Sequence, residues 1–164
     1  MEIRIGRVDD FDHVEPMVAA SIADAFYRAD LTADQIAENE HIVAIARRSC
    51  LSAVAADKRI VFVAKPEPTV LAGFVIVDRT GPAMPEIDWM IVAPAYQGSG
   101  VAGHLMHQAF AWIGPNLPVT LGVIHFNARA IAFYRKHGFI ETDSLTTRHR
   151  IPRRVMIRPA TGST

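Results

Sequence analysis

The sequence predicts an α/β fold in which helices flank one mixed β-sheet. Apolar residues alternate in some segments with the two-residue period of strands and recur in others at helical spacing. In chain order these segments read β-α-α-β-β-β-α-β-α-β-β, which is typical of an α/β arrangement. No repeat, low-complexity tract or linker divides the 164 residues, and a chain of this length is the size of one ordinary domain. We therefore expect a single domain over residues 1–164.

The first segments predict one strand and one helix. Ile3 and Ile5 alternate with polar or small residues, which indicates a strand over residues 2–7. Apolar residues at helical spacing follow, and Pro16 is tolerated there only in a first turn, so the helix begins near Asp12. The pattern breaks over residues 26–31, where we expect a loop.

A second helix and a hairpin come next. Thr32 and Gln35 have the spacing of a capping box, which predicts a helix that begins just after Thr32. Two runs rich in β-branched and aromatic residues, 59–65 and 70–78, predict strands. Because only a short Pro-Glu-Pro segment separates them, we expect a hairpin.

The second half of the chain predicts four strands and two helices. Gly114 and Gly138 each follow a helical pattern and end it, while Asn127 caps the start of the second helix. The run before Asn127 is nearly continuous in apolar residues, as expected for a strand covered on both faces. The expected elements are strands over residues 86–92, 118–125, 139–143 and 153–158 and helices over residues 98–113 and 127–137.

Composition narrows the function classes. The formal net charge is zero, so no overall charge attracts the chain to nucleic acid or to an anionic membrane. Cys50 is the only cysteine, which excludes an intramolecular disulfide and a cysteine-based metal site. No apolar run approaches the roughly 18 residues that span a bilayer. We expect a cytoplasmic enzyme or binding protein with no nucleic-acid or membrane partner.

The segment from Gln97 to Gly103 is a glycine-rich turn between a strand and an amphipathic helix. Free backbone N–H groups at a helix N-terminus bind anions, and small residues let the backbone approach a phosphate closely. Gly98, Gly100 and Ala102 meet that need, and Ser99 adds a hydroxyl donor. The turn lacks the lysine of a Walker A loop and does not fit the Rossmann fingerprint.

Two spaced motifs resemble those of the GNAT acetyltransferase superfamily. Gln97, Gly100 and Ala102 match its acyl-CoA pattern Q/R-x-x-G-x-G/A, which follows a strand ending near Pro94. About 30 residues later the chain has the family's N-x-x-A-x-x-F/Y-Y-x-x-x-G-F pattern, carried by Asn127, Ala130, Phe133, Tyr134, Gly138 and Phe139. The resemblance covers residues 86–141 well. It implies a mostly antiparallel mixed sheet with helices on both faces and an acetyl-CoA-dependent N-acetyltransferase that needs no metal.

The resemblance also implies roles for individual residues. Tyr134 is the expected general acid toward the departing sulfur of CoA. Asn127 either reaches the cofactor or only caps its helix. The expected cofactor-binding residues are Ile91 and Val92 beside the pantetheine arm, Gln97, Gly98, Ser99, Gly100, Val101 and Ala102 around the pyrophosphate, and Asn127 and Tyr134.

The general base is not decided by the resemblance, so candidates come from residue chemistry. An alkylamine is mostly protonated at neutral pH and must lose a proton before it attacks. Asp88 and Glu86 share one face of the expected strand 86–92, and a carboxylate in a central strand needs a partner or a cleft. Asp88 is the preferred candidate, and His125 is an outside one. His104 and His107 are expected to be solvated and not metal ligands.

The acceptor is left open by the sequence. In the family it enters between the first two helices and the late strands, here residues 21–30 and 143–151. Asp24, Asp30, Phe26 and Tyr27 suit a cation, whereas the basic residues from Arg148 to Arg154 suit an acidic acceptor or the 3′-phosphate of CoA. The expected reaction is direct attack of a primary amine, from a small molecule or a peptide, on acetyl-CoA. The alternatives are a non-catalytic acyl-CoA-binding module and a protein-interaction domain; homodimers are common in the family.

Overall fold

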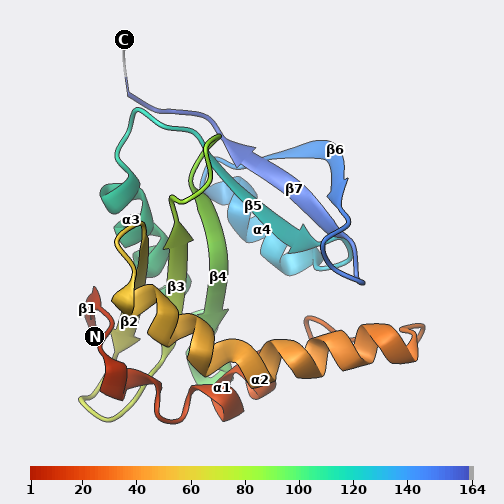
Figure 1. Cartoon of the computed structure of the whole chain (residues 1–164), viewed down its shortest axis with the longest axis horizontal. Helices are drawn as coiled ribbons and strands as arrows, with labels where there is room; N and C mark the ends of the chain where they lie inside the picture. Colours follow the sequence, from red (N-terminus) through yellow and green to blue (C-terminus); the bar gives the residue numbers. More distant parts are fainter. Residues whose placement is uncertain (163–164) are drawn as a thin grey trace.

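A computed structural model describes residues 1–162, and its centre is a seven-stranded sheet in the order β1-β2-β3-β4-β5-β7-β6 (Figure 1). All neighbouring strands are antiparallel except β4 and β5, which are parallel. The elements are β1 (Glu2–Ile5), α1 (Val14–Ile22), α2 (Ala33–Ala55), β2 (Arg59–Lys65), β3 (Gly73–Asp78), β4 (Glu86–Val92), α3 (Val101–Ile113), β5 (Val119–Ile124), α4 (Ala128–Lys136), β6 (Ile140–Thr146) and β7 (Arg153–Arg158), with 3₁₀ turns at Val8–Phe11 and Pro94–Tyr96.

Helices cover both faces of this sheet. On one face α1 and α2 pack against β2, β3 and β4 in a core that contains Phe11, Val18, Phe74 and Ile76. On the other face α3 and α4 pack against the sheet around Leu105 and Met106. The predicted fold class and element order are confirmed. Among the described residues no helix is both long and apolar enough to cross a membrane.

Local signals placed several element boundaries correctly. The Thr32 hydroxyl accepts from the Gln35 N–H at 3.2 Å, and the Gln35 side chain accepts from the Thr32 N–H, so the predicted capping box starts α2. The strands β2 and β3 form the predicted hairpin. Asn127 caps α4, and Gly138 follows it with φ of 89°.

Other boundaries differ for identifiable reasons. The helix α3 begins at Val101 and not at Gly98, because Gly98 and Gly100 have φ of 79° and 90°, outside the helical region. The helix α1 begins at Val14, which leaves Pro16 in its first turn. The prediction that β5 is covered on both faces is wrong, since Gly122 is exposed and only the face with Val119, Leu121 and Val123 joins a core.

The parallel contact between β4 and β5 is short. It joins Glu86 to Thr120 and Ile87 to Leu121, after which the two strands diverge (Figure 1). A bulge lies at this point, because Val77 of β3 pairs with Ile87 and Ile76 pairs with Trp89, leaving Asp88 as the extra residue. The last residues of β4 therefore keep β3 on one side and have no strand on the other.

Candidate active site

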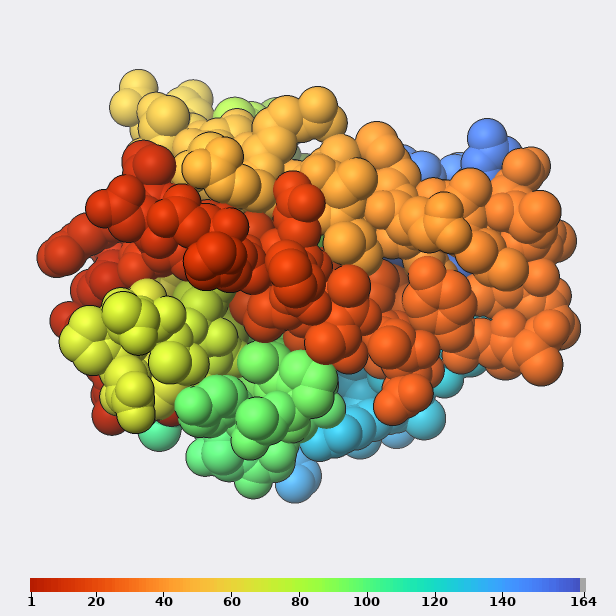
Figure 2. All heavy atoms as spheres, turned by 90° about the horizontal axis from the view of Figure 1, so that it is seen from below, coloured from red at the N-terminus to blue at the C-terminus, as the bar shows by residue number. Residues whose placement is uncertain are grey.

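A cleft of about 970 Å³ lies where β4 and β5 diverge. Its walls are the end of α1 with the following loop, the last residues of β4, the glycine-rich turn and the start of α4. The segments that border it meet on one face of the molecule, seen in red to orange, green and cyan in Figure 2. The predicted phosphate turn and the first part of the predicted acceptor wall, up to Arg28, thus line one cavity, whereas residues 143–151 of that predicted wall do not line it.

The glycine-rich turn presents unpaired backbone donors to this cleft. The N–H groups of Gln97 and Ser99 are used within the turn, donating to Pro94 and Tyr96. Within residues 1–162, no acceptor is bound by the amides of Gly98, Gly100, Val101, Ala102 and Gly103. A Cβ at Gly98 or Gly100 would meet nothing within 4 Å, so the space in front of the turn is open. Clustered free donors at the N-terminus of α3 suit an anion.

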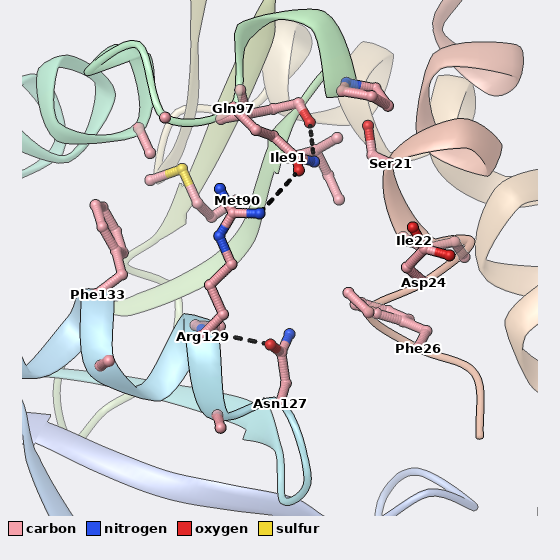
Figure 3. Close-up of a pocket in the computed structure, with 18 of the residues that line it drawn as sticks. Ser21, Ile22, Asp24, Phe26, Met90, Ile91, Gln97, Asn127, Arg129 and Phe133 are labelled. Atoms are coloured by element: carbon pink, nitrogen blue, oxygen red, sulfur yellow. Dashed lines mark hydrogen bonds between the residues drawn. The ribbon is translucent and has the colours of Figure 1, made fainter.

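Side chains add positive charge and close one end of the turn. The Gln97 amide donates to the Val92 carbonyl at 3.2 Å and accepts from Arg129 of α4 at 3.3 Å, which links the turn, β4 and α4 (Figure 3). Lys136 also lines the cleft. Neither Arg129 nor Lys136 forms an ion pair with a carboxylate of the described residues. Sequence reasoning missed both, although they lie in the helix that carries the second motif.

The free edge of β4 forms the floor of the cleft. Met90, Ile91 and Val92 line it, and they pair with β3 on the opposite side only. Unpaired backbone N–H and C=O groups on a strand edge suit an extended ligand that carries amides.

Tyr134 lines the cleft from α4 and is held by aromatic neighbours. Its ring packs edge-on against Phe133 and Phe139, with centroids 5.4 Å and 5.8 Å away. Burial raises the pKa of Tyr134 to about 12, so its phenol stays protonated at neutral pH and can donate. Asn127 also lines the cleft, and its side-chain oxygen accepts from the Ala130 N–H at 3.2 Å. It is therefore a helix cap whose amide nitrogen makes no hydrogen bond within the described chain.

The opposite wall comes from the end of α1 and the loop that follows. Ser21, Asp24, Phe26, Tyr27 and Arg28 line the cleft there. Buried Asn39 of α2 donates to the Phe26 carbonyl at 2.9 Å, and the guanidinium of buried Arg153 lies 5.3 Å from the centre of the Phe26 ring. The two side chains fix this wall from behind. Asp30 does not line the cleft and is ion-paired with Arg28.

A family model decides what this arrangement represents. The description of that model is an acetyltransferase (GNAT) domain, and it matches residues 57–141. This chain belongs to the GNAT acetyltransferase family. The match spans the hairpin, β4, the glycine-rich turn, β5 and α4, which supply most of the cleft. A search by sequence against curated proteins finds no match.

Solved structures share the GNAT fold over nearly the whole chain. The PaiA N-acetyltransferase of Thermoplasma acidophilum, in complex with coenzyme A, is 15% identical with a TM-score of 0.76, covering 97% of this chain and 99% of that one. The ribosomal-protein-S18-alanine N-acetyltransferase of Escherichia coli is 18% identical with a TM-score of 0.69, covering 99% and 96%. The YncA structure of Salmonella typhimurium with acetyl-CoA is 19% identical with a TM-score of 0.63, covering 100% and 96%.

The two carboxylates predicted as GNAT base candidates lie outside the cleft lining. Asp88 is 3.5 Å from Arg59, and Glu86 is 3.1 Å from Arg148. Partial burial, with the Glu86 charge nearby, raises the pKa of Asp88, while Arg59 opposes the shift. The bulge at Asp88 explains the placement, because it breaks the alternation that would carry Asp88 onto the face of Met90 and Val92. A base role for either residue stays a prediction that needs a water path.

The histidine candidates, and Ser99 and Val101 among the predicted cofactor-binding residues, also lie outside the cleft lining. His125 is exposed and packs edge-on against Phe126, and His104 and His107 are exposed on α3. The described residues hold no group of three side chains suited to a metal ion. Burial raises the pKa of the Cys50 thiol to about 12. The basic cluster is largely neutralised, since Arg148, His149, Arg150 and Arg153 each face a carboxylate of Glu86, Asp34 or Glu38.

Proposed function

We propose that this GNAT protein is an N-acetyltransferase that moves the acetyl group of acetyl-CoA to a primary amine. The observation that carries the proposal is the pairing of two features in one cleft. Free amides at the start of α3 stand beside the free edge of β4. The first feature suits a pyrophosphate, and the second suits the amide-bearing pantetheine arm. Arg129 and Lys136 add charge of the sign that phosphates require.

The cleft residues fit acetyl-CoA and divide its binding between them. The amides of Gly98, Gly100, Val101, Ala102 and Gly103 would hold the phosphates. Gln97 would brace the turn, and so would the Ser99 hydroxyl, which donates to the Tyr96 carbonyl. Ile91 and Val92 would pair with the pantetheine arm through their backbone. The Asn127 amide nitrogen remains free to donate to the same arm. The cofactor supplies an acetyl group activated as a thioester.

Tyr134 would serve as the proton donor to the sulfur. In the net reaction a carbon–nitrogen bond forms, the carbon–sulfur bond breaks, and one proton passes from the amine to the sulfur. A phenol that stays protonated can supply that proton or stabilise the sulfur by a hydrogen bond. The amine would lose its proton to water or to a base reached through water, for which Asp88 remains the predicted candidate.

The test is acetyl transfer by the purified protein. Acetyl-CoA is mixed with a panel of primary amines and amino-terminal peptides, and release of the CoA thiol is followed together with the mass of each acceptor. The proposal predicts thiol release that depends on both protein and amine, with an acetylated product. Binding of acetyl-CoA without transfer to any amine would instead identify a non-catalytic acyl-CoA-binding module. No binding at all would favour a protein-interaction domain on the same fold.

A further inference from the structure

Asp24 is the only carboxylate among the residues that line the described cleft. It follows the end of α1, and its side chain lies on the wall opposite Phe133 (Figure 3). It is exposed and forms neither a hydrogen bond nor an ion pair with any residue from 1 to 162. By contrast, Asp30, Glu86 and Asp88 are each paired with an arginine. Asp24 therefore has its full hydrogen-bonding capacity available to a ligand.

The end of α1 adds negative potential at the same place. Ala20, Ser21 and Ile22, the last residues of the helix, line the cleft. In the described chain the carbonyls of Ala20 and Ser21 accept no hydrogen bond, whereas Ile22 accepts from the Phe26 N–H. The last carbonyls of a helix carry partial negative charge and favour a cation.

Aromatic side chains complete this end of the cleft. Phe126 already has the Arg28 guanidinium 4.4 Å from its ring centre, and Phe26 has Arg153 behind it. Tyr27 lines the cleft, is 37% exposed, and has no cation from residues 1–162 over its ring. Its ring is therefore available to a cation that enters this end of the cleft.

The cleft is thus polarised along its length. The phosphate end has the N-terminus of α3 with Arg129 and Lys136, which attract negative charge. The other end has Asp24 and the C-terminus of α1, while Arg28 is neutralised by Asp30. An anionic acceptor would meet the unfavourable end, and a cationic one the favourable end.

We propose that Asp24 binds a positively charged group of the acceptor, so that the acceptor class is amines carrying a second cation, such as diamines. The reacting nitrogen must be uncharged when it attacks, so a carboxylate that binds an ammonium group serves a second nitrogen. This inference rests on the proposed acetyl transfer. It assigns specificity to a residue in the loop between α1 and α2.

The experiment compares acceptors that share one reacting amine and differ in the charge of the far end. These are 1,4-diaminobutane, 4-amino-1-butanol and 4-aminobutanoate, measured by thiol release with wild type and Asp24→Asn. We expect wild type to prefer the diamine over the alcohol and the alcohol over the acid. A hydrogen bond to a charged group contributes about 1.5–3 kcal/mol, so D24N should lower kcat/KM for the diamine roughly 10- to 100-fold, mainly through KM. The value for the alcohol should change less than about threefold.

Two controls separate this inference from the proposed function. Asp57→Asn removes the same charge from an exposed, unpaired aspartate outside the cleft lining, and it should retain the diamine preference. Affinity for acetyl-CoA should be equal in wild type and D24N, because Asp24 lies on the α1 wall of the cleft and not on the turn proposed to hold the phosphates (Figure 3). If acetyl-CoA fails to bind wild type, the proposed function has failed. If acetyl-CoA binds, three results would overturn the role of Asp24. These are an equal loss of kcat/KM with all three acceptors in D24N, no preference of wild type for the diamine, and no transfer to any of the three acceptors.

Discussion

At the scale of single residues, the site depends on a few side chains whose surroundings fix their chemistry. Tyr134 is placed between Phe133 and Phe139, and burial raises its pKa to about 12. A phenol with that pKa does not ionise over the range in which enzymes are usually assayed, so its proton is available for donation throughout. The proposed role of Asp24 rests on the opposite situation, because its carboxylate lines a cleft and has no partner among residues 1–162.

Replacing Tyr134 by Phe tests the donor role. Loss of a general acid costs about 10²- to 10⁴-fold in rate, so kcat of Y134F should fall by that order while the Kd for acetyl-CoA changes less than about threefold. Steady-state kinetics and calorimetric titration measure the two quantities. Because the Tyr134 pKa is about 12, the profile of kcat between pH 6 and 10 should keep its shape in the variant. A kcat near that of wild type would remove Tyr134 from the mechanism.

At the scale of elements, the divergence of β4 from β5 creates the cleft, and close packing on the β3 side holds β4 in place. Gly73 of β3 pairs with Val92, and a Cβ there would lie 2.7 Å from the Ile91 carbonyl oxygen. Because that contact is with backbone, rotation of a side chain cannot relieve it. The position of the cleft floor therefore depends on the absence of a side chain at Gly73.

We expect Gly73→Ala to displace the end of β4. Overpacking of this kind costs about 1–3 kcal/mol, and the shift should also weaken binding of acetyl-CoA through Ile91 and Val92. Gly81→Ala is the matched control, since a Cβ at that loop position would meet nothing within 4 Å. Urea unfolding and titration with acetyl-CoA measure both effects. If G73A and G81A behave alike, the tight contact does not position the strand.

The sequence predicted the turn and the caps well because both depend on local backbone chemistry. Gly98 and Gly100 have positive φ, which glycine adopts readily, and Asn127 caps α4 with its side-chain oxygen. The side of β4 on which Asp88 lies was harder to predict. The prediction assumed that side chains alternate strictly along the strand, and the bulge at Asp88 breaks that alternation. The lone position of Asp24 in the cleft was equally hidden, since it depends on how α1 meets β4 and α4 in space. The pattern of one segment does not predict which distant segment it will contact in the folded chain.

At the scale of the whole molecule, one buried ionic cluster ties the N-terminal segment to the sheet far from the cleft. Asp10 lies 2.7 Å from Arg4 of β1 and 3.2 Å from Lys65 of β2, and its side chain is 6% exposed. Burial alone would raise the pKa of Asp10, but hydrogen bonds from Arg4, the Arg7 backbone and Lys65 lower it to about 2. The titration of the Asp10 carboxyl therefore makes the free energy of unfolding depend on pH.

The folded pKa of Asp10 lies below its unfolded value of about 3.9, so its stabilising contribution is present above that value and is lost as the pH falls toward 2. Asp10→Asn should lower the free energy of unfolding by about 2–4 kcal/mol at pH 7, because it leaves buried Lys65 without its carboxylate and half-buried Arg4 with Glu2 alone. The difference from wild type should shrink steadily between about pH 5 and pH 2.5. Urea unfolding across that range measures it, and a difference independent of pH would contradict the assignment.

The central claim is that the backbone at the start of α3 holds the phosphates of acetyl-CoA, and two glycines allow a matched test. Gly100 and Gly114 flank α3, have φ of 90° and 87°, and would each place a Cβ in open space. Alanine at either position therefore carries backbone strain, about 1–2 kcal/mol at Gly100 in the left-handed helical region and more at Gly114, whose ψ of 166° lies in a region that glycine alone adopts readily, but only Gly100 faces the cleft.

The measurement is the thermal unfolding midpoint of wild type, Gly100→Ala and Gly114→Ala with and without acetyl-CoA at a hundred times the wild-type Kd. Binding at that excess stabilises by about 2.7 kcal/mol and should raise the midpoint by about 5–10 °C. We predict this shift in wild type and G114A and its loss or near loss in G100A. Equal shifts in both variants, or no shift in wild type, would contradict the account.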